Sequence, residues 1–288
     1  MTQREPATRL LAPAARAPFL RAYQARTLLG LLRGAQTARG ATFTVMFPRQ
    51  SGKNEVAAAL VACLLWTNAA RGGSVVVCAP AFRPQSRISI ERTREALAAL
   101  APLAPPGVQA RTAGNVITFG RARAVFLSAA VGAHVAGHTA SLGLIADEAQ
   151  EIEATWFDRQ FRPMAASTGA PTALFGTPWD GTTLLERAVA ANREHDARGG
   201  AVRLHHEVSW REVAASLPAY GDYVRYERNR LGPNHPLYLS QYELVASDAA
   251  GRLLSPGQLA LIEGSHPREC TPRPGERYAG GLDLGGEG

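Results

Sequence analysis

Short apolar runs alternate with longer helical patterns along the chain up to Asp180. Most of these runs show no strict alternation of apolar and polar residues, which is typical of strands buried on both faces. We expect strands at Thr42–Phe47, Ser74–Ala79, Ala124–Ser128, Leu142–Ala146 and Thr172–Gly176. Helical patterns lie between several of them, at Asn54–Trp66, Ser86–Leu100 and in the acidic stretch Glu148–Phe157. This order predicts an α/β fold whose mostly parallel sheet is flanked by helices.

The pattern changes after Asp180. A helix is expected at Thr182–Arg198, a strand at Val202–Val208 and a helix at Tyr220–Leu231, and prolines then interrupt the chain repeatedly. We therefore predict a core of residues 1–179 and a smaller, partly helical lid and linker subdomain of residues 180–275. The last residues, 276–288, suit a first strand that needs neighbours to be stable, so we expect them to begin a further domain.

The composition supports a sizeable globular core. Hydrophobic residues make up 46% of the 288 residues and charged residues 19%, a balance unlike that of disordered chains. The three cysteines are far apart and form no C-x-x-C pair, which argues for a reducing compartment. The N-terminus lacks the apolar core of a signal peptide, and the longest apolar run, Val56–Trp66, is too short to span a bilayer. We expect a soluble, cytoplasmic protein that has no membrane partner.

The net charge of +7 comes almost entirely from arginine, because Lys53 is the only lysine. A basic surplus fits a polyanionic partner such as nucleic acid, and it also fits a genome that prefers Arg codons. Four arginines follow the second expected strand, where they would contact phosphates or form a solvated helix face. They are Arg83, Arg87, Arg92 and Arg94.

A phosphate-binding loop is predicted where the first strand ends. Residues Thr42–Asn54 read TFTVMFPRQSGKN, so that a β-branched, apolar run breaks at Pro48 into a polar loop, and Gly52-Lys53 then open an Ala-rich helix. In such a loop, backbone N–H groups and a helix N-terminus face the phosphates, and the lysine ammonium binds the β and γ oxygens. The alternative is an ordinary strand-to-helix turn.

This loop departs from the usual pattern at two positions. Phe47 stands where a leading glycine is usual, and Asn54 stands where a Ser or Thr hydroxyl normally helps to hold Mg²⁺. The side-chain carbonyl of Asn54 can still face a hard cation directly or through water.

Two further strand ends carry polar residues that suit the same site. SLGLIADEAQ is an apolar strand that ends in Asp147 and Glu148, and TALFGTPWDG is an apolar strand that ends in Gly176-Thr177. The carboxyl ends of parallel strands face the crevice where ligands bind. Asp147 would hold Mg²⁺, Glu148 would orient and deprotonate the attacking water, and the Thr177 hydroxyl would bond that water or report the γ-phosphate. The alternatives are acids that begin the next helix and a plain Thr-Pro turn.

These motifs together resemble the large terminase subunit of tailed bacteriophages, the motor that packages DNA into procapsids. The likeness covers nearly the whole chain. RQSGK, Arg49–Lys53, is similar to the family's variant phosphate loop, and TASLGLIADEAQEI is similar to its Walker B segment. FGTPWDGTTLLE is similar to the coupling motif and the beginning of the lid. PNHPLYLSQYELVA is similar to the "Phe/Tyr-x-x-Gln-Tyr" segment near the end of the ATPase portion.

The resemblance implies a P-loop ATPase of the RecA-like, additional-strand class that hydrolyses ATP with Mg²⁺. It implies a homo-oligomeric ring around double-stranded DNA, with the portal protein and the small terminase subunit as partners. Carried over by position, the phosphate-binding residues are Gln50, Ser51, Gly52, Lys53 and Asn54.

The resemblance also assigns roles outside the phosphate-binding positions. Arg49 would sense or clamp the γ-phosphate, and Thr177 would couple hydrolysis to movement of the lid. An aromatic-Gln pair, here Tyr23-Gln24, would hold adenine, although an ordinary amphipathic helix start explains that pair as well.

Two features of the family have incomplete counterparts here. No arginine precedes the Walker B strand where several relatives carry a trans-acting finger, and Arg121 and Arg123 are the nearby alternatives. Asp283 matches the first metal ligand of the family's RNase H-like nuclease domain, but further carboxylates would lie beyond Gly288. DNA hydrolysis is therefore not expected of this chain as given.

Other functions remain alternatives at this point. A helicase-like DNA-remodelling ATPase shares the upstream Gln, the Gly-Lys loop and Asp-Glu-Ala, but residues 180–273 do not suggest a second RecA-like domain. A catalytically inactive terminase fragment would serve as an assembly module. His134 and His138 have the i, i+4 spacing of a zinc pair on a helix, but no third ligand is near them in the sequence.

Overall fold

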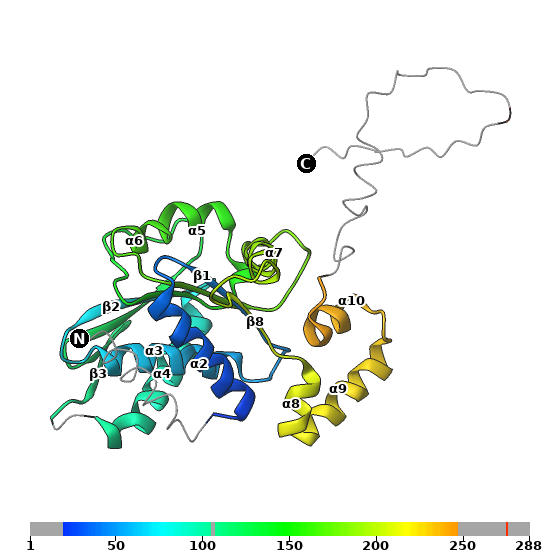
Figure 1. The fold of residues 1–288 in the computed structure, drawn as a ribbon, viewed down its shortest axis with the longest axis horizontal. Coiled ribbons are helices and arrows are strands. Elements are labelled where there is room, and N and C mark those ends of the chain that lie inside the picture. The colour runs from blue at the N-terminus through cyan, green and yellow to red at the C-terminus, as the bar shows by residue number, and fades with distance from the viewer. Residues whose placement is uncertain (1–19, 105–106, 247–274, 276–288) are drawn as a thin grey trace. The chain divides into compact units, whose positions relative to one another are not determined.

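The computed structural model describes residues 20–104, 107–246 and 275, and within them the chain forms an eight-stranded sheet (Figure 1). The strands are β1 (Thr42–Met46), β2 (Gly73–Ala79), β3 (Ala110–Ala113), β4 (Val116–Phe119), β5 (Ala122–Ser128), β6 (Gly143–Ala146), β7 (Thr172–Gly176) and β8 (His205–Glu207). Their order across the sheet is β3-β4-β5-β2-β6-β7-β1-β8. Pairing is parallel from β5 to β8 and antiparallel between β3, β4 and β5. The prediction of a mostly parallel α/β sheet is confirmed.

Helices cover both faces of this sheet. They are α2 (Ala22–Thr37), α3 (Lys53–Thr67), α4 (Arg87–Leu100), α5 (Ala154–Gln160), α6 (Pro163–Ala166), α7 (Leu184–Ala197), α8 (Trp210–Ser216), α9 (Pro218–Leu231) and α10 (Pro236–Tyr238). Short helical turns are η1 (Phe82–Ser86), η2 (Ala101–Leu103), η3 (Ala149–Glu151) and η4 (Leu239–Glu243). Figure 1 shows α2, α3 and α4 on one face of the sheet and α5, α6 and α7 on the other.

The apolar strands have no solvent face because both of their faces are covered. In β2, Val75 and Val77 belong to the cluster under α2, α3 and α4, whereas Val76 and Cys78 belong to the cluster under α5, α6 and α7. Successive side chains of a strand point to opposite faces, so a continuous apolar run is what two covered faces require. Helix α3 is buried from Val56 to Leu65 between the sheet and its neighbouring helices, which explains its Ala-rich sequence.

Three local features differ from the sequence prediction. The hairpin strands β3 and β4 were not expected, because β3 is exposed along its whole length and carries no apolar pattern. The helix expected over Glu148–Phe157 is wrong as a single element. Glu148 has a left-handed φ of 49°, η3 follows it, and α5 begins only after Glu153, whose carboxylate accepts hydrogen bonds from the Thr155 and Trp156 N–H groups. The strand expected over Val202–Val208 is reduced to β8.

The residues after Asp180 that the structure describes join the same compact unit as the earlier strands. That unit spans residues 1–250, and a second unit spans residues 251–288. Helix α7 packs on β1 and β7, and β8 extends the sheet beside β1. The predicted boundary between a core and a lid subdomain at residue 180 stays a prediction. Asp283 and the strand expected near it lie outside the described residues.

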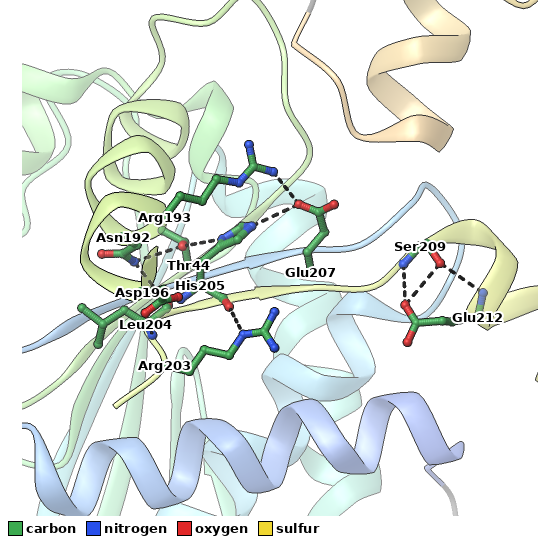
Figure 2. Close-up of polar contacts among 10 residues, drawn as sticks. All are labelled: Thr44, Asn192, Arg193, Asp196, Arg203, Leu204, His205, Glu207, Ser209 and Glu212. Atoms are coloured by element: carbon green, nitrogen blue, oxygen red, sulfur yellow. Dashed lines mark hydrogen bonds and ion pairs between the residues drawn. The ribbon is translucent and has the colours of Figure 1, made fainter. Parts of the chain in front are cut away.

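At the start of the edge strand β8, the backbone groups around His205 are bonded to side chains (Figure 2). The Asp196 carboxylate at the end of α7 accepts the N–H groups of Leu204 and His205, each at 2.9 Å. Arg203 Nε donates to the His205 carbonyl at 2.8 Å. An edge whose donors and acceptors are occupied in this way is a poor template for another strand.

Beneath this edge, a buried polar chain joins α7, β1 and β8 (Figure 2). Asn192 Nδ2 donates to Thr44 Oγ1 at 3.0 Å, and Thr44 Oγ1 lies 2.9 Å from His205 Nδ1. His205 Nε2 lies 3.1 Å from Glu207 Oε2, which Arg193 also contacts. Because Asn192 donates to the Thr44 hydroxyl, that hydroxyl can give its own proton to Nδ1. The Nε2–H of His205 then donates to Glu207, so every member of the chain is satisfied.

Within the residues that the structure describes, no helix has the length and apolar character needed to cross a membrane.

We predict that His206 makes the fold acid-sensitive. Its ring packs against Gly30 of α2, so closely that a Cβ on Gly30 would lie 2.6 Å from His206 Cε1. Burial, together with nearby Arg203, lowers the pKa of His206 to about 4. The unfolded chain binds this proton near pH 6.5, so the contribution to stability is complete above that pH and is lost as the pH falls toward 4. The loss is about 3 kcal/mol. Urea unfolding at pH 7 and pH 4.5 should show a smaller pH dependence for His206→Leu than for wild type, and His134→Gln, on the exposed surface, should match wild type.

Candidate active site

The predicted site residues come from the carboxyl ends of three neighbouring parallel strands. Strands β6, β7 and β1 are adjacent in the sheet and run in the same direction. The phosphate loop follows β1, Asp147 and Glu148 follow β6, and Thr177 follows β7. The parallel topology thus brings the three sequence motifs to one edge of the sheet, as expected for a ligand site in such a fold.

The phosphate loop is held in a left-handed conformation at two positions. Gln50 has a φ of 61° and Gly52 a φ of 88°, and Gly52 is the residue that precedes α3. Within the loop, Ser51 Oγ donates to the Pro48 carbonyl at 2.6 Å. The conformation places Lys53 at the first position of α3, where the side chain is only 9% exposed. A helix N-terminus that follows such a loop presents N–H groups and a positive dipole to an anion.

Tyr23 and Gln24 at the start of α2 support this loop from one side. Tyr23 Oη donates to the Ser51 carbonyl at 2.7 Å, and Gln24 Nε2 donates to the Gly52 carbonyl at 3.1 Å. Both side chains are almost completely buried. A Cβ at position 52 would lie 2.2 Å from Gln24 Nε2, so glycine is required there by packing as well as by its φ. Adenine contact by this pair stays a prediction, and in this structure both side chains bind the loop.

The C-terminal part of the described chain supports the loop from the other side. The Arg49 N–H donates to the Gln241 carbonyl at 2.9 Å, and Arg49 Nη1 donates to Gln241 Oε1 at 3.2 Å. Tyr220 Oη of α9 donates to the Arg49 carbonyl at 2.6 Å. Sequence reasoning gave neither Gln241 nor Tyr220 a role, although Gln241 lies in the segment that carried part of the resemblance. The γ-phosphate role of Arg49 stays a prediction.

Asp147 is a buried carboxylate at the centre of the site. The Glu148 N–H donates to its Oδ1 at 3.1 Å, and Ser89 Oγ of α4 lies 3.4 Å from its Oδ2. Burial raises the pKa of Asp147, and the nearby Lys53 ammonium opposes this rise. Asn54, Ser89 and Thr93 line one small cavity together with Asp147, and the other side chains around this space are apolar.

Glu148 forms an ion pair with the loop lysine. Lys53 Nζ lies 2.8 Å from Glu148 Oε2, and Gln150 Nε2 donates to the same oxygen at 2.7 Å. Burial alone would raise the pKa of Glu148, but the Lys53 charge and the Gln150 hydrogen bond outweigh it and lower this pKa. Glu148 is therefore an ionised carboxylate, able to accept a proton, and it is held at the phosphate-binding lysine.

Thr177 is connected to Glu148 through a residue that the sequence analysis did not assign. The Thr177 N–H donates to Gln150 Oε1 at 3.2 Å. Gln150 is the last residue of the DEAQ stretch, two residues after Glu148. The DEAQ stretch gave no sign that its last side chain turns back toward the base.

Other candidates lie away from this edge of the sheet. Arg121 and Arg123 lie at the amino end of β5, where Arg123 Nε donates to Ser74 Oγ at 2.8 Å, so they are at the edge opposite the phosphate loop. Within the described ranges, no group of three His, Cys, Asp or Glu residues could hold a metal ion, which leaves His134 and His138 without further ligands.

We predict that Tyr23 stabilises the phosphate loop through its hydroxyl. Tyr23→Phe keeps the ring, which packs 5.9 Å from the Phe47 ring, but leaves the Ser51 carbonyl without this donor. The free energy of unfolding should fall by about 1–3 kcal/mol, because a buried acceptor becomes unsatisfied. Chemical denaturation measures this change. The exposed Tyr226 provides the matched control, since Tyr226→Phe should leave stability unchanged; equal effects of the two changes would contradict the assignment.

No protein-family model and no curated protein matches the chain. Solved structures do match it at low sequence identity. The ATPase domain of the Thermus phage P74-26 large terminase is 18% identical, with a TM-score of 0.58 over 75% of this chain and 93% of that one. The HK97 bacteriophage large terminase is 16% identical, with a TM-score of 0.61 over 85% of this chain and 55% of that one. The large terminase of a thermophilic bacteriophage, in complex with ADP, is 15% identical, with a TM-score of 0.59 over 78% of this chain and 53% of that one.

The chain thus spans about half the length of the HK97 protein and of the ADP-bound terminase, and most of the P74-26 domain. At these identities the match concerns the fold, and it agrees with the resemblance drawn from the sequence motifs. The described part of the chain has the RecA-like P-loop fold of phage large-terminase ATPase domains.

Proposed function

We propose that this chain is the ATPase motor domain of a phage large terminase subunit, which hydrolyses ATP to translocate double-stranded DNA into a procapsid. The observation that carries the proposal is the 2.8 Å pair between Lys53 at the phosphate loop and Glu148 at the end of β6. In a fold shared with terminase ATPase domains, this pair puts a phosphate-binding cation and an ionised carboxylate at one point. The large terminase of the thermophilic bacteriophage, which has the same fold, is described in complexes with ADP and with ATP-gamma-S, which supports a nucleotide as the ligand.

In the proposed reaction, the loop N–H groups and Lys53 bind the β- and γ-phosphates. Phosphate oxygens become partners of the Lys53 ammonium, so its hold on Glu148 weakens as the triphosphate binds. Water attacks the γ-phosphorus and gives a proton to Glu148. The bond from the γ-phosphorus to the bridging oxygen breaks, and ADP leaves with that oxygen. Arg49 would stabilise the charge on the γ-phosphate. Thr177 would couple the loss of that phosphate to movement of the lid.

The Asp147 carboxylate and its polar neighbours offer oxygen ligands for a magnesium ion. Burial raises the pKa of the Asp147 carboxyl, so a cation beside it would favour the ionised form. Asn54 and Ser89 lie beside Asp147, at a small cavity whose remaining lining is mostly apolar. A hard cation prefers such oxygen ligands. Asp147 and Asn54 would hold Mg²⁺ directly or through water, and the ion supplies charge neutralisation for the β- and γ-phosphates.

The ring, the portal protein and the small terminase subunit are proposed as partners from the resemblance. Arg121 and Arg123 lie at the opposite edge of the sheet, so in such a ring they could act only on the site of a neighbouring subunit. In the same ring, Tyr23-Gln24 would contact adenine at the loop that they support.

A groove beside the site supports contact with the DNA backbone. Arg83, Arg87 and Arg94 line a cavity of about 610 Å³ between the η1–α4 segment and the turn that joins β3 to β4. Arg87 Nε lies 3.5 Å from Glu91, and this exposed pair leaves the groove with a positive balance. Helix α4 carries Ser89, which contacts Asp147, so one helix connects the groove to the proposed magnesium site.

The first experiment measures Mg²⁺-dependent ATP hydrolysis by the wild-type chain, alone and with double-stranded DNA. We expect Glu148→Gln to lower kcat by about 100-fold or more while ATP-gamma-S still binds, because the variant keeps the shape of the base but not its charge. Lys53→Ala should abolish nucleotide binding. Glu95→Gln, an exposed acid on α4, is the matched control and should keep wild-type turnover. A wild type without turnover under all conditions would favour an inactive assembly module instead.

The second experiment tests the arginine groove. Combined substitution of Arg83, Arg87 and Arg94 by Ala should weaken binding of a double-stranded oligonucleotide and reduce the slope of log K against log salt by about 2 to 3. The ATPase measured without DNA should be unchanged. Fluorescence anisotropy at several salt concentrations gives the slope, and Arg159→Ala, which removes one exposed arginine of α5, is the control for loss of a single surface charge elsewhere. An unaltered salt slope in the triple variant would exclude these three side chains as phosphate contacts.

A further inference from the structure

We propose that Gln150 is a positioning residue of the ATPase site, whose side-chain amide fixes Glu148 and ties it to the backbone of Thr177. This inference rests on the proposed function, since it assigns a role in the hydrolysis that Glu148 would perform. It concerns a residue that the sequence motifs left without a function. Two hydrogen bonds of the Gln150 amide and the space that the amide occupies carry it.

The first contact orients the base. Gln150 Nε2 donates to Glu148 Oε2 at 2.7 Å, and Lys53 Nζ lies 2.8 Å from the same oxygen. Among the described residues, no hydrogen bond reaches Glu148 Oε1. Two donors thus fix one carboxylate oxygen and leave the other to receive a proton. When phosphate oxygens draw Lys53 away, Gln150 remains the donor that holds the carboxylate.

The second contact connects the base to the next strand. Gln150 Oε1 accepts the Thr177 N–H at 3.2 Å, just beyond the end of β7. A carboxylate accepts and a backbone N–H donates, so only one of the two orientations of the amide satisfies both partners. Rotating the amide by half a turn would break both hydrogen bonds together. Glu148 and Thr177 are therefore linked through a single rigid group.

The third observation is the space that the amide occupies. A Cβ at Gly176 would lie 2.2 Å from Gln150 Oε1 and 2.6 Å from Leu185 Cδ2, closer than packed atoms approach. Glycine at the end of β7 thus makes room for the amide and for the Leu185 side chain. Gly176 has no left-handed φ, so these two close approaches, rather than a turn, account for glycine at this position.

The backbone of Glu148 makes such a support necessary. Its φ of 49° is unusual for a residue with a side chain, and η3 begins directly after it. The same turn brings Gln150 back over Glu148, two residues earlier in the chain. A shift of the Thr177 turn would move the amide and, through it, the carboxylate, so the state of the β7 turn would set the position of the base.

The kinetic test compares two single variants and one double variant. Gln150→Met keeps the length of the side chain but removes both hydrogen bonds, and Gly176→Ala displaces the amide together with the Leu185 side chain. Each should lower kcat roughly 10- to 100-fold, as expected for loss of a hydrogen bond to a charged group, while KM for ATP changes less than about twofold. Gln150→Met should cause no further loss in a Glu148→Gln background. A merely structural role would lower kcat in both backgrounds.

Gln85 provides the matched control. Its amide also bridges a backbone N–H and a carboxylate, with Ala81 N at 3.0 Å and Glu151 Oε2 at 3.5 Å, but it does not touch Glu148. Gln85→Met should therefore leave kcat within about twofold of wild type. An equal loss in Gln85→Met and Gln150→Met would overturn the assignment.

A second measurement does not depend on turnover. By NMR, hydrogen exchange of the Thr177 amide should become roughly tenfold faster in Gln150→Met and stay unchanged in Gln85→Met. Glu148→Ala should shift the Thr177 amide resonance in the wild-type background and not in the Gln150→Met background, because the link then no longer exists.

The outcomes separate this inference from the proposed function. Wild-type turnover together with normal kcat and normal Thr177 exchange in Gln150→Met would overturn the inference alone. A wild type that hydrolyses no ATP would overturn the proposed function and the catalytic role of Gln150 with it, and the exchange data would then show whether the bridge itself exists.

Discussion

The nearly buried charge of Lys53 needs a compensating partner, and the arrangement of the site depends on this requirement. The side chain is 9% exposed, and its ammonium is paired with Glu148, which is 26% exposed. Removing one partner of such a pair leaves an uncompensated charge and costs about 3–5 kcal/mol. The pair therefore constrains the ends of β1 and β6 to lie together. It also keeps Glu148 ionised, which is the state that a general base needs.

The loop that presents Lys53 is supported by chain segments from both ends of the described sequence. Tyr23 and Gln24 hold its carbonyls from α2, and Tyr220 and Gln241 hold Arg49 from α9 and η4. A loop with two left-handed residues is conformationally costly, so it persists only when its surroundings determine it. Here, hydrogen bonds to the carbonyls of Arg49, Ser51 and Gly52 hold the loop, although the glycine that usually leads the motif is missing. Phe47 fills that position as a fully buried ring instead.

Much of this arrangement could be predicted from the sequence, because its signals are local. The five buried strands appear as apolar runs, and Lys53, Asp147 and Glu148 follow strand ends, where parallel topology brings them together. The strand β3 could not be predicted with equal ease, since a strand that is exposed along its whole length needs no apolar pattern. Its partner β4 buries Ile117 and Phe119 but is only four residues long. The roles of Gln150 and Gln241 were out of reach for another reason. Each depends on which backbone atoms the fold places beside the amide, and no spacing in the sequence encodes a contact such as that between Arg49 and Gln241.

The closed edge of β8 limits how copies of this domain can meet. Asp196 and Arg203 already occupy the N–H and C=O groups around His205, so a neighbouring chain cannot pair with the start of this strand without first displacing them. Contacts between copies at this point are left to side chains. Contacts of that kind can slide and re-form, whereas a shared ladder of backbone hydrogen bonds fixes two subunits in one register. In the proposed ring, such a boundary would let neighbouring subunits change their orientation.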